Sequence, residues 1–289
     1  MAAVSGLTGC ASTWDDMTSR RFREKPFGTT FRKDDPVQVL RSNPDGADRA
    51  RAMKNLQEPL AIGRPEAEQE EMMQILATAA ASDPSPWVRL AAIDALGRFR
   101  DPRTADALVA AYHQADGRLT RPTPPPPPEG AIRPASGSRG DPSALADRFG
   151  LAGPQGFSSD QVANIRGRSI DALAKKTDPK IVNFLANVAK GQELPPEEDP
   201  AAKDFVRQRA VAGLGKIRTK EAAVALATVL TAENGKDVPL MHLAHEGLVG
   251  LTGQKLPADP EKWNAIVQTD FQIAPEPGVL QKAVSMELP

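Results

Sequence analysis

The sequence contains one cysteine, Cys10, among its 289 residues. A single cysteine cannot form a disulfide within the chain, and it cannot supply a cysteine-based zinc site. Aromatic residues make up only 4% of the chain. Runs in which β-branched residues alternate with polar ones are missing, so the sequence gives no indication of a β-sheet.

Long apolar runs and charge of one sign are also lacking. No stretch of about 20 apolar residues occurs, so the sequence predicts no transmembrane helix. Lysine and arginine number 36 against 37 acidic residues, a net charge of -1, which argues against a nucleic-acid partner. Nucleophile elbows, Walker loops and dinucleotide fingerprints are missing as well, so we expect no catalytic residues and no cofactor.

Residues 86–111 carry the clearest pattern in the chain. Apolar residues recur there at three- and four-residue spacing, which predicts a helix with one buried face. Asp101-Pro102 interrupts the pattern, because proline disfavours helical geometry in the residue before it and fits the first turn of a new helix. A second stripe, Ala105, Leu108 and Val109, follows. One helical hairpin cannot bury both faces, so this unit requires copies of itself.

The copies are present. The segment 206–215 repeats the residues of 88–97 at an offset of 118 positions. Weaker copies divide the chain into units one and two at 46–115 and units three to five at 160–268, with Trp263 and Ile266 facing inward in the last. The sequence therefore predicts an all-α solenoid of about five helical hairpins, in which each repeat contacts only its neighbours.

The shared pattern Val-Arg-x-x-Ala-hydrophobic-x-x-Leu-Gly, followed by an Asp-Pro turn and an alanine-rich helix, resembles HEAT repeats. More narrowly, it resembles the HEAT-like units first described in phycobilin lyases. The segment 245–263 is similar to the last repeat of HEAT-repeat proteins from planctomycete-type bacteria. The resemblance implies a right-handed superhelix with a concave face, and a chromophore enzyme or accessory as one functional alternative.

Two residue types recur within the repeats. Arg89 and Arg207 occupy one position, near Asp94 or acidic residues between units. We expect each to form a salt bridge or a hydrogen bond to a neighbouring turn, with ligand contact as the alternative. Gly97 and Gly215 are expected to end or closely pack the first helices, as glycine does at helix C-termini.

The N-terminal segment contains Leu7-Thr8-Gly9-Cys10, which resembles a bacterial lipobox. The resemblance implies a signal at 1–9, lipid on Cys10 and a tether at 10–45, and acyl chains would hold the domain on a bilayer. No lysine or arginine precedes the cysteine, and the apolar run is shorter than a signal core. A start codon assigned too far downstream would explain both departures. An incidental cysteine in a cytoplasmic chain is the alternative.

Residues 116–159 contain the proline run Pro124–Pro128 among glycine, serine and arginine. Polyproline favours an extended helix without internal hydrogen bonds, and the apolar content is too low for independent folding. We expect a disordered insertion between units two and three, with a docking peptide for an aromatic groove as the alternative. Residues 269–289 are expected to form a C-terminal tail.

The three histidines offer little metal chemistry. His242 and His245 are three residues apart, but a metal site needs a third ligand, and we expect Glu246 to point elsewhere. His113 is expected to be exposed near a helix end. No metal site is predicted.

These observations favour a non-catalytic protein-binding scaffold of the bacterial cell envelope. We expect an unidentified protein partner on the concave face and a membrane anchor through lipid on Cys10, facing the periplasm. A cytoplasmic scaffold without lipid and a phycobilin-lyase-like enzyme or accessory are the alternatives.

Overall fold

The computed structural model describes residues 36–43, 45–116, 156–176, 178–196, 199–269 and 271–275. These residues form eleven α-helices and one 3₁₀-helix, and they contain no strand. None of the helices within these ranges is long and apolar enough to cross a membrane. The helices are α3 (Pro36–Ser42), α4 (Gly46–Lys54), η1 (Leu60–Ile62), α5 (Glu66–Ser82), α6 (Pro86–Arg98), α7 (Arg103–His113), α9 (Ser159–Leu173), α10 (Pro179–Ala189), α11 (Pro200–Leu214), α12 (Lys220–Glu233), α13 (Val238–Thr252) and α14 (Pro260–Val267).

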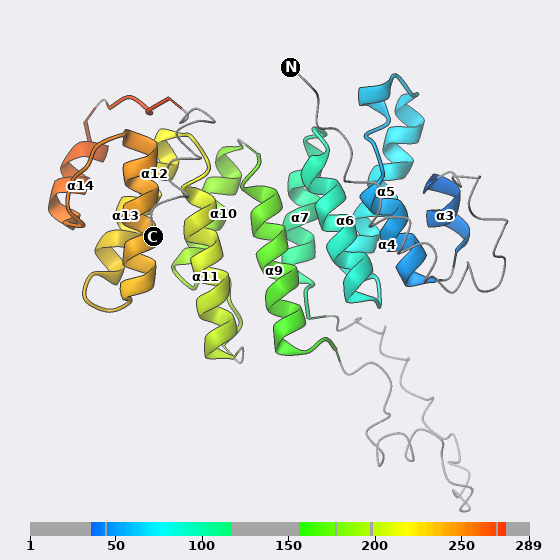
Figure 1. Cartoon of the computed structure of the whole chain (residues 1–289), viewed down its shortest axis with the longest axis horizontal. Coiled ribbons are helices and arrows are strands. Elements are labelled where there is room, and N and C mark those ends of the chain that lie inside the picture. The colour runs from blue at the N-terminus through cyan, green and yellow to red at the C-terminus, as the bar shows by residue number, and fades with distance from the viewer. Residues whose placement is uncertain are drawn as a thin grey trace, which may run out of the picture.

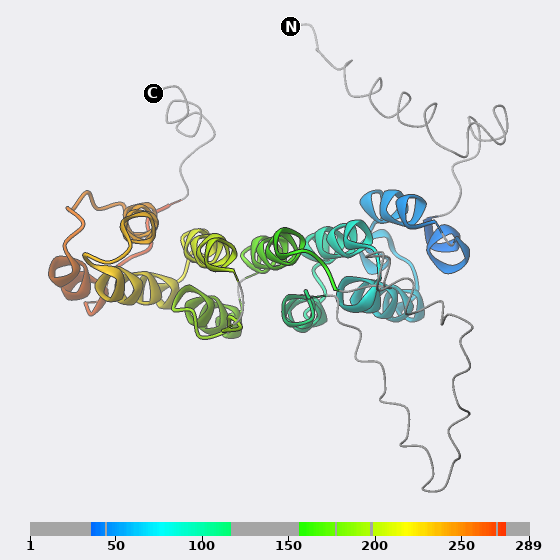
Figure 2. The same ribbon diagram turned by 90° about the horizontal axis from the view of Figure 1, so that it is seen from below.

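Ten of these helices form five successive hairpins, which confirms the predicted all-α solenoid (Figure 1). The first helices of the hairpins, α4, α6, α9, α11 and α13, pack side by side in one layer, and the second helices form the other. Figure 2 shows that the first-helix layer is hollowed, with its two ends raised above its middle, whereas the second-helix layer bows outward. The first helices therefore line the concave face.

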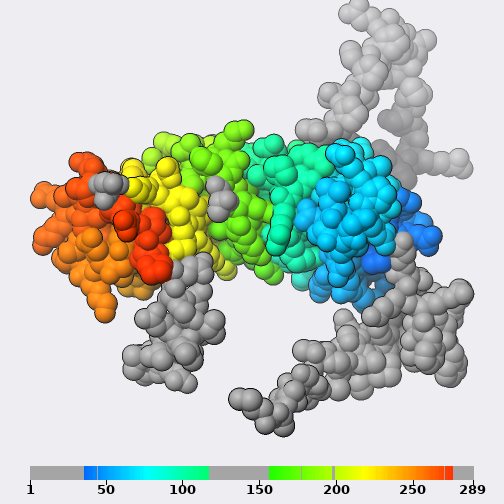
Figure 3. All heavy atoms as spheres, turned by 90° about the horizontal axis from the view of Figure 1, so that it is seen from above, coloured from blue at the N-terminus to red at the C-terminus, as the bar shows by residue number. Residues whose placement is uncertain are grey.

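The solenoid has two long edges. We call the side where the two helices of each unit join the turn edge, which lies at the top of Figure 1. The opposite side, where successive units join, is the loop edge. Figure 3 looks down on the turn edge, along which the units follow one another in a row from blue to red.

Local capping explains where many of the helices begin. Aspartate side chains accept hydrogen bonds from main-chain amides in the first turns of five helices, and Ser158 forms a reciprocal capping box with Gln161 at α9. Such caps satisfy amides that lack a partner within the helix. Proline follows the aspartate in several of them, where its fixed φ suits the helical geometry. The five aspartates are Asp45, Asp178, Asp199, Asp237 and Asp259.

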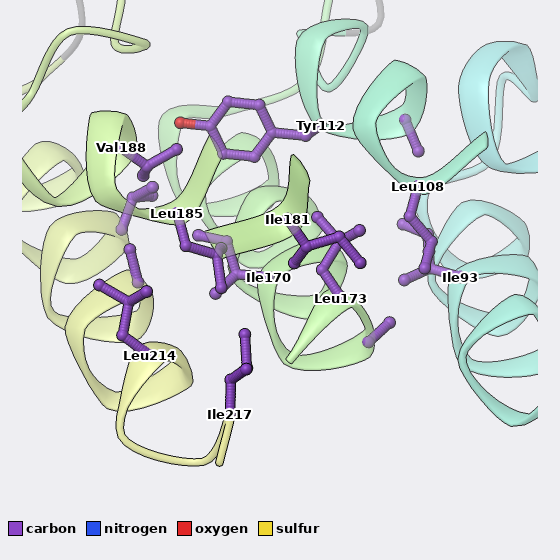
Figure 4. Close-up of a cluster of buried hydrophobic side chains, with 14 of the residues drawn as sticks. Ile93, Leu108, Tyr112, Ile170, Leu173, Ile181, Leu185, Val188, Leu214 and Ile217 are labelled. Atoms are coloured by element: carbon purple, nitrogen blue, oxygen red, sulfur yellow. The ribbon is translucent and has the colours of Figure 1, made fainter. Parts of the chain in front are cut away.

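The core runs without interruption along the solenoid. Figure 4 shows its middle, where side chains of units two, three and four meet between the two layers. Ile93, Ile170 and Val211, which occupy the same register position, are fully buried. The predicted inward position of Trp263 is confirmed, and its indole Nε1 donates to the carbonyl of Pro257 at 2.9 Å.

Glycine permits two close helix contacts in the first-helix layer. A Cβ at Gly97 would lie 3.0 Å from the Cβ of Ala172 in α9. A Cβ at Gly215 would lie 3.1 Å from the Cα of Gly247 in α13. Gly215 ends α11 with φ of -63°, which any residue can adopt. Close packing, rather than a left-handed helix end, is therefore what these two glycines provide.

Both ends of the solenoid include residues that the sequence assigned to a tether and a tail. In α3, which lies within the predicted tether at 10–45, Leu40 is buried against the solenoid. Beyond α14, the ring of Phe271 is only 8% exposed, and the amide of Ala274 donates to the carbonyl of Leu251 at 2.8 Å. These segments cover the terminal units, which have a neighbour on one side only.

The insertion leaves and re-enters the solenoid at one point on the loop edge. The amide of Phe157 donates to the carbonyl of Asp116 at 3.0 Å. Helix α9 begins at Ser159, one residue before the predicted start of unit three. Because α9 packs against both α6 and α7, the stacking of units two and three continues across the insertion. Residues 117–155, including Pro124–Pro128, lie outside the described residues, as does Cys10.

Candidate interaction surfaces

The recurring arginines bind the C-terminal ends of the second helices. Arg89 is 1% exposed, and it donates from Nε to the carbonyl of Asp83 at 2.7 Å and from Nη1 to that of Gln114 at 2.5 Å. Arg207 donates from Nε to the carbonyl of Ala189 at 2.9 Å. Each arginine thus joins two successive units, and the hydrogen bonds to neighbouring turns are as predicted.

Of the acidic residues expected near these arginines, those between units are found and Asp94 is not: Asp237, between units four and five, lies 3.7 Å from Arg207. Arg207 pairs with Glu233 at 2.6 Å, at the end of its own second helix. Asp94, which the sequence placed near Arg89, instead lies 3.8 Å from Arg168 of the next unit. The main-chain contacts of the arginines are favourable because the last carbonyls of a helix lack partners and carry partial negative charge.

The environment of Arg89 is electrostatically mixed. Burial lowers the pKa of its guanidinium, and the nearby Asp83 and Asp116 act in the opposite direction. The guanidinium also lies 4.7 Å from the ring centre of Phe157, where the chain re-enters the solenoid. Arg89 therefore connects the ends of α5 and α7 to both ends of the insertion. These contacts account for its burial without a ligand.

Two further arginines occupy this position, although the sequence analysis did not single them out. Arg166 of unit three donates from Nε to the carbonyl of Tyr112 at 3.5 Å. Arg49 of unit one pairs with Asp83 at 2.8 Å. Unit five has Ala244 at this register. Alignment of all units by their leucine and isoleucine positions would have revealed this series.

The exposed side of the first-helix layer carries Trp87 and, at the equivalent position of α11, the half-buried Phe205. Trp87, near the start of α6, is 73% exposed. Leu90 is half-buried one turn further along, followed by Asp94. Ion pairs join the neighbouring helices on this side, with Asp171 and Arg209 at 3.1 Å. The concave face therefore has a protruding tryptophan at one end of α6 and a row of charged contacts beyond it.

A pocket of about 440 Å³ lies on the turn edge between units two and three. Its cationic lining residues are Arg98, Arg100, Lys175 and Lys176. Arg98 donates to the carbonyls of Met53 at 2.8 Å and Lys54 at 3.3 Å. These carbonyls lie at the end of α4.

Lys176 is held in the same way at the end of the neighbouring helix. It donates from Nζ to the carbonyl of Phe99 and, at 3.3 Å, to that of Leu96. Burial is the largest effect on its pKa and lowers it, and Lys175 adds to the effect, while Glu58 and Asp101 oppose it. On the turn edge, as on the loop edge, cations therefore bind the carbonyls at helix C-termini.

A second pocket, of about 410 Å³, lies at the N-terminal end of the solenoid. Val37, Leu56, Ile62 and Met72 form apolar parts of its wall. Ion pairs lie at its rim, including Arg41 with Glu71 at 2.5 Å. Ile62 is half-exposed there.

The histidines do not converge on a metal site. His245 contacts the carbonyl of Leu256 through Nε2 at 2.7 Å and packs its ring against Trp263. His242 lies 3.2 Å from Glu246, so the expectation that Glu246 points away from both histidines is wrong, because residues four apart share a helix face. His113 is half-exposed at the end of α7, as predicted. No cluster of metal-ligating side chains occurs among the described residues.

These helical pairs define an α-solenoid. A family model for HEAT repeats matches residues 34–122, the segment from the start of α3 through units one and two. The match supports HEAT repeats in these two units, and the later helices continue the same solenoid. No curated protein and no solved structure gives a significant match to the chain.

Proposed function

We propose that this chain is a non-catalytic scaffold that binds a partner protein on its concave first-helix face. The observation that carries the proposal is the exposure of Trp87 on that face. Tryptophan is enriched among the few residues that dominate protein–protein binding energy. A tryptophan left in water at a helix surface gains a large burial area when a partner covers it.

The surroundings of Trp87 agree with this role. It lies near the loop edge, where the acidic residues Asp83 and Asp116 also lie. The half-buried Leu90 extends the apolar surface along α6 toward the charged pair of Asp94 and Arg168. A central apolar residue with a rim of polar residues is typical of a protein–protein binding surface.

A matched pair of variants tests the proposal. The partner is identified by proximity labelling in the native host, and its affinity for the purified chain is then measured by calorimetry. Trp87→Ser should weaken binding at least tenfold, as the loss of an aromatic anchor typically does. Val224→Ser removes a side chain that is 45% exposed on α12, in the other layer, and should leave binding unchanged. Equal affinities of the two variants would contradict the proposal.

We further propose that lipid on Cys10 holds this scaffold in the bacterial cell envelope. The support is the tetrapeptide 7–10, whose last residue is the chain's one cysteine. Radiolabelled palmitate should be incorporated into the wild-type chain in a bacterial host and not into Cys10→Ser. Equal labelling of both, or recovery of the unlabelled chain in the cytoplasmic fraction, would favour the cytoplasmic alternative.

A further inference from the structure

Charge differs between the two edges of the solenoid. The turns of units two, three and four contain nine cations and three carboxylates: Arg98, Arg100, Arg103, Lys175, Lys176, Lys180, Lys216, Arg218 and Lys220 against Asp101, Asp178 and Glu221. Among described residues, the loop edge is closer to balance: Asp83, Asp116, Asp160, Glu193, Asp199, Glu233 and Asp237 lie there with Lys190, Lys236 and the arginines Arg49, Arg89, Arg166 and Arg207. The net charge of -1 conceals this difference.

Two of these three carboxylates, Asp101 and Asp178, are occupied by their own helices. Asp101 accepts from the main-chain amide of Arg103 at 3.0 Å and pairs with its guanidinium at 2.8 Å. Asp178 accepts from the amide of Lys180 at 2.9 Å and caps α10. Their lone pairs are thus directed to helix N-termini, where a negative charge is favourable.

Several cations, in contrast, are held by neutral groups. Arg98 and Lys176 are bound by carbonyls at the ends of α4 and α6, and Arg218 donates to the carbonyl of Ala274. Carbonyl oxygens fix the positions of these head groups without cancelling their full charge. Arg100 and Lys175 are exposed and line the pocket beside them. Because two of the four cations in the pocket are already ordered, an anion that enters it loses less free energy to side-chain ordering.

We infer that the turn edge of units two to four is a second binding surface, which recognises an extended acidic segment of a partner protein. One acidic side chain enters the pocket between units two and three, and others reach the turn of unit four. Charge complementarity favours an acidic partner, because opposite charges orient the two molecules and raise their rate of encounter. The surface is separate from Trp87, and the inference does not depend on the function proposed for that residue.

The spacing favours a peptide over a nucleic acid. Neighbouring packed helices lie about 8–10 Å apart, and a peptide in the extended polyproline II conformation rises about 3.1 Å per residue with three residues per turn. Acidic residues at every third position would therefore meet successive turns. A nucleic acid presents its phosphates more closely than the turns are spaced.

A defined peptide tests the inference on the full chain. The probe is a fluorescently labelled twelve-residue peptide with glutamate at every third position and glycine and serine elsewhere, and its control has glutamine for glutamate. At about 20 mM salt, where screening is weak, the glutamate peptide should bind and the glutamine peptide should not. Binding should weaken as salt is added.

Matched double variants locate the surface. The change Arg100→Ala with Lys175→Ala should weaken binding about tenfold, at about threefold for each exposed charge. The change Lys190→Ala with Lys236→Ala removes the same charge from the loop edge and should leave binding within a factor of about two. Circular dichroism checks that all variants remain folded.

Three outcomes would overturn the inference. The first is that the glutamate peptide does not bind the wild-type chain. The second is that the two double variants lose affinity equally, which would indicate a diffuse charge effect. The third is that a single-stranded DNA of equal charge binds more tightly than the peptide and is weakened by the same turn-edge variant, which would indicate a nucleic-acid surface.

Discussion

Replacement of Arg89 by methionine tests whether arginines that cross between units stabilise the solenoid. Methionine retains much of the length and apolar contact of the side chain but donates no hydrogen bond. The change removes the donors to the carbonyls of Asp83 and Gln114, at 2.7 and 2.5 Å, and the guanidinium over the ring of Phe157. It therefore weakens contacts among α5, α6, α7 and the end of the insertion at once.

The expected magnitude follows from these contacts. A hydrogen bond from a charged donor contributes about 1.5–3 kcal/mol, and a cation over an aromatic ring about 0.5–2 kcal/mol. Burying the charge of Arg89 costs free energy, as its lowered pKa indicates. Removing the charge recovers that cost and so offsets part of the energy lost with the hydrogen bonds and the ring contact. We expect a net loss of about 3 kcal/mol in the free energy of unfolding, comparable to other broken buried networks.

Urea titration followed by far-UV circular dichroism measures this loss. Repeat arrays do not always unfold in one step, so hydrogen exchange in the last turns of α5 and α7 provides a local readout and should increase there first. The control is Arg168→Met, which breaks an exposed pair with Asp94 at 3.8 Å and should cost no more than about 0.5 kcal/mol. A cost for Arg89→Met below about 1 kcal/mol, or one equal to the control, would refute the reasoning.

Two further sites give contrasting predictions. Gly97→Ala places a Cβ 3.0 Å from that of Ala172, so we expect a loss of about 1 kcal/mol in thermal or urea unfolding as the helices separate. Gly250→Ala meets nothing within 4 Å and should stabilise α13 by about 0.5–1 kcal/mol; destabilisation there would contradict the helix assignment. The hydrogen bond from Arg103 lowers the pKa of Asp101. Its stabilising effect relative to Asp101→Asn should therefore be present at neutral pH and shrink below about pH 4, the ordinary carboxyl range, where Asp101 of the unfolded chain becomes protonated. A constant difference in urea midpoint between pH 7 and pH 3 would argue against that pairing.

The repeat architecture was predictable because it depends on local periodicity. Ile93, Ile170 and Val211 stand at helical spacing from other apolar residues, and the copy at an offset of 118 positions identifies the repeat directly. The arginine contacts followed from the same register. In each case the decisive information lies within about 15 residues of chain, the range over which a helix and its turn are specified.

The candidate surfaces were less predictable because stacking creates them. Trp87 is apolar and stands beside the buried Val88, so composition alone does not reveal that it faces solvent. Lys175 lies more than 70 residues from Arg98 in the sequence, and the insertion separates them, yet both line one pocket. The roles of Leu40 and Phe271 likewise depend on the exposed ends of the terminal units, which no local pattern describes.

On both edges, cations bind the carbonyls at helix C-termini, but the net charge around these cations differs between the two edges. On the loop edge, Arg89 and Arg207 bind helix C-termini among several carboxylates, so their charges are largely balanced. On the turn edge, Arg98 and Lys176 bind helix C-termini where the carboxylates are fewer than the cations. Stability requires a cation at each of these positions, but it does not require that the surrounding charges cancel. The excess on the turn edge is therefore not explained by folding alone, and that excess is what favours an acidic partner for this surface.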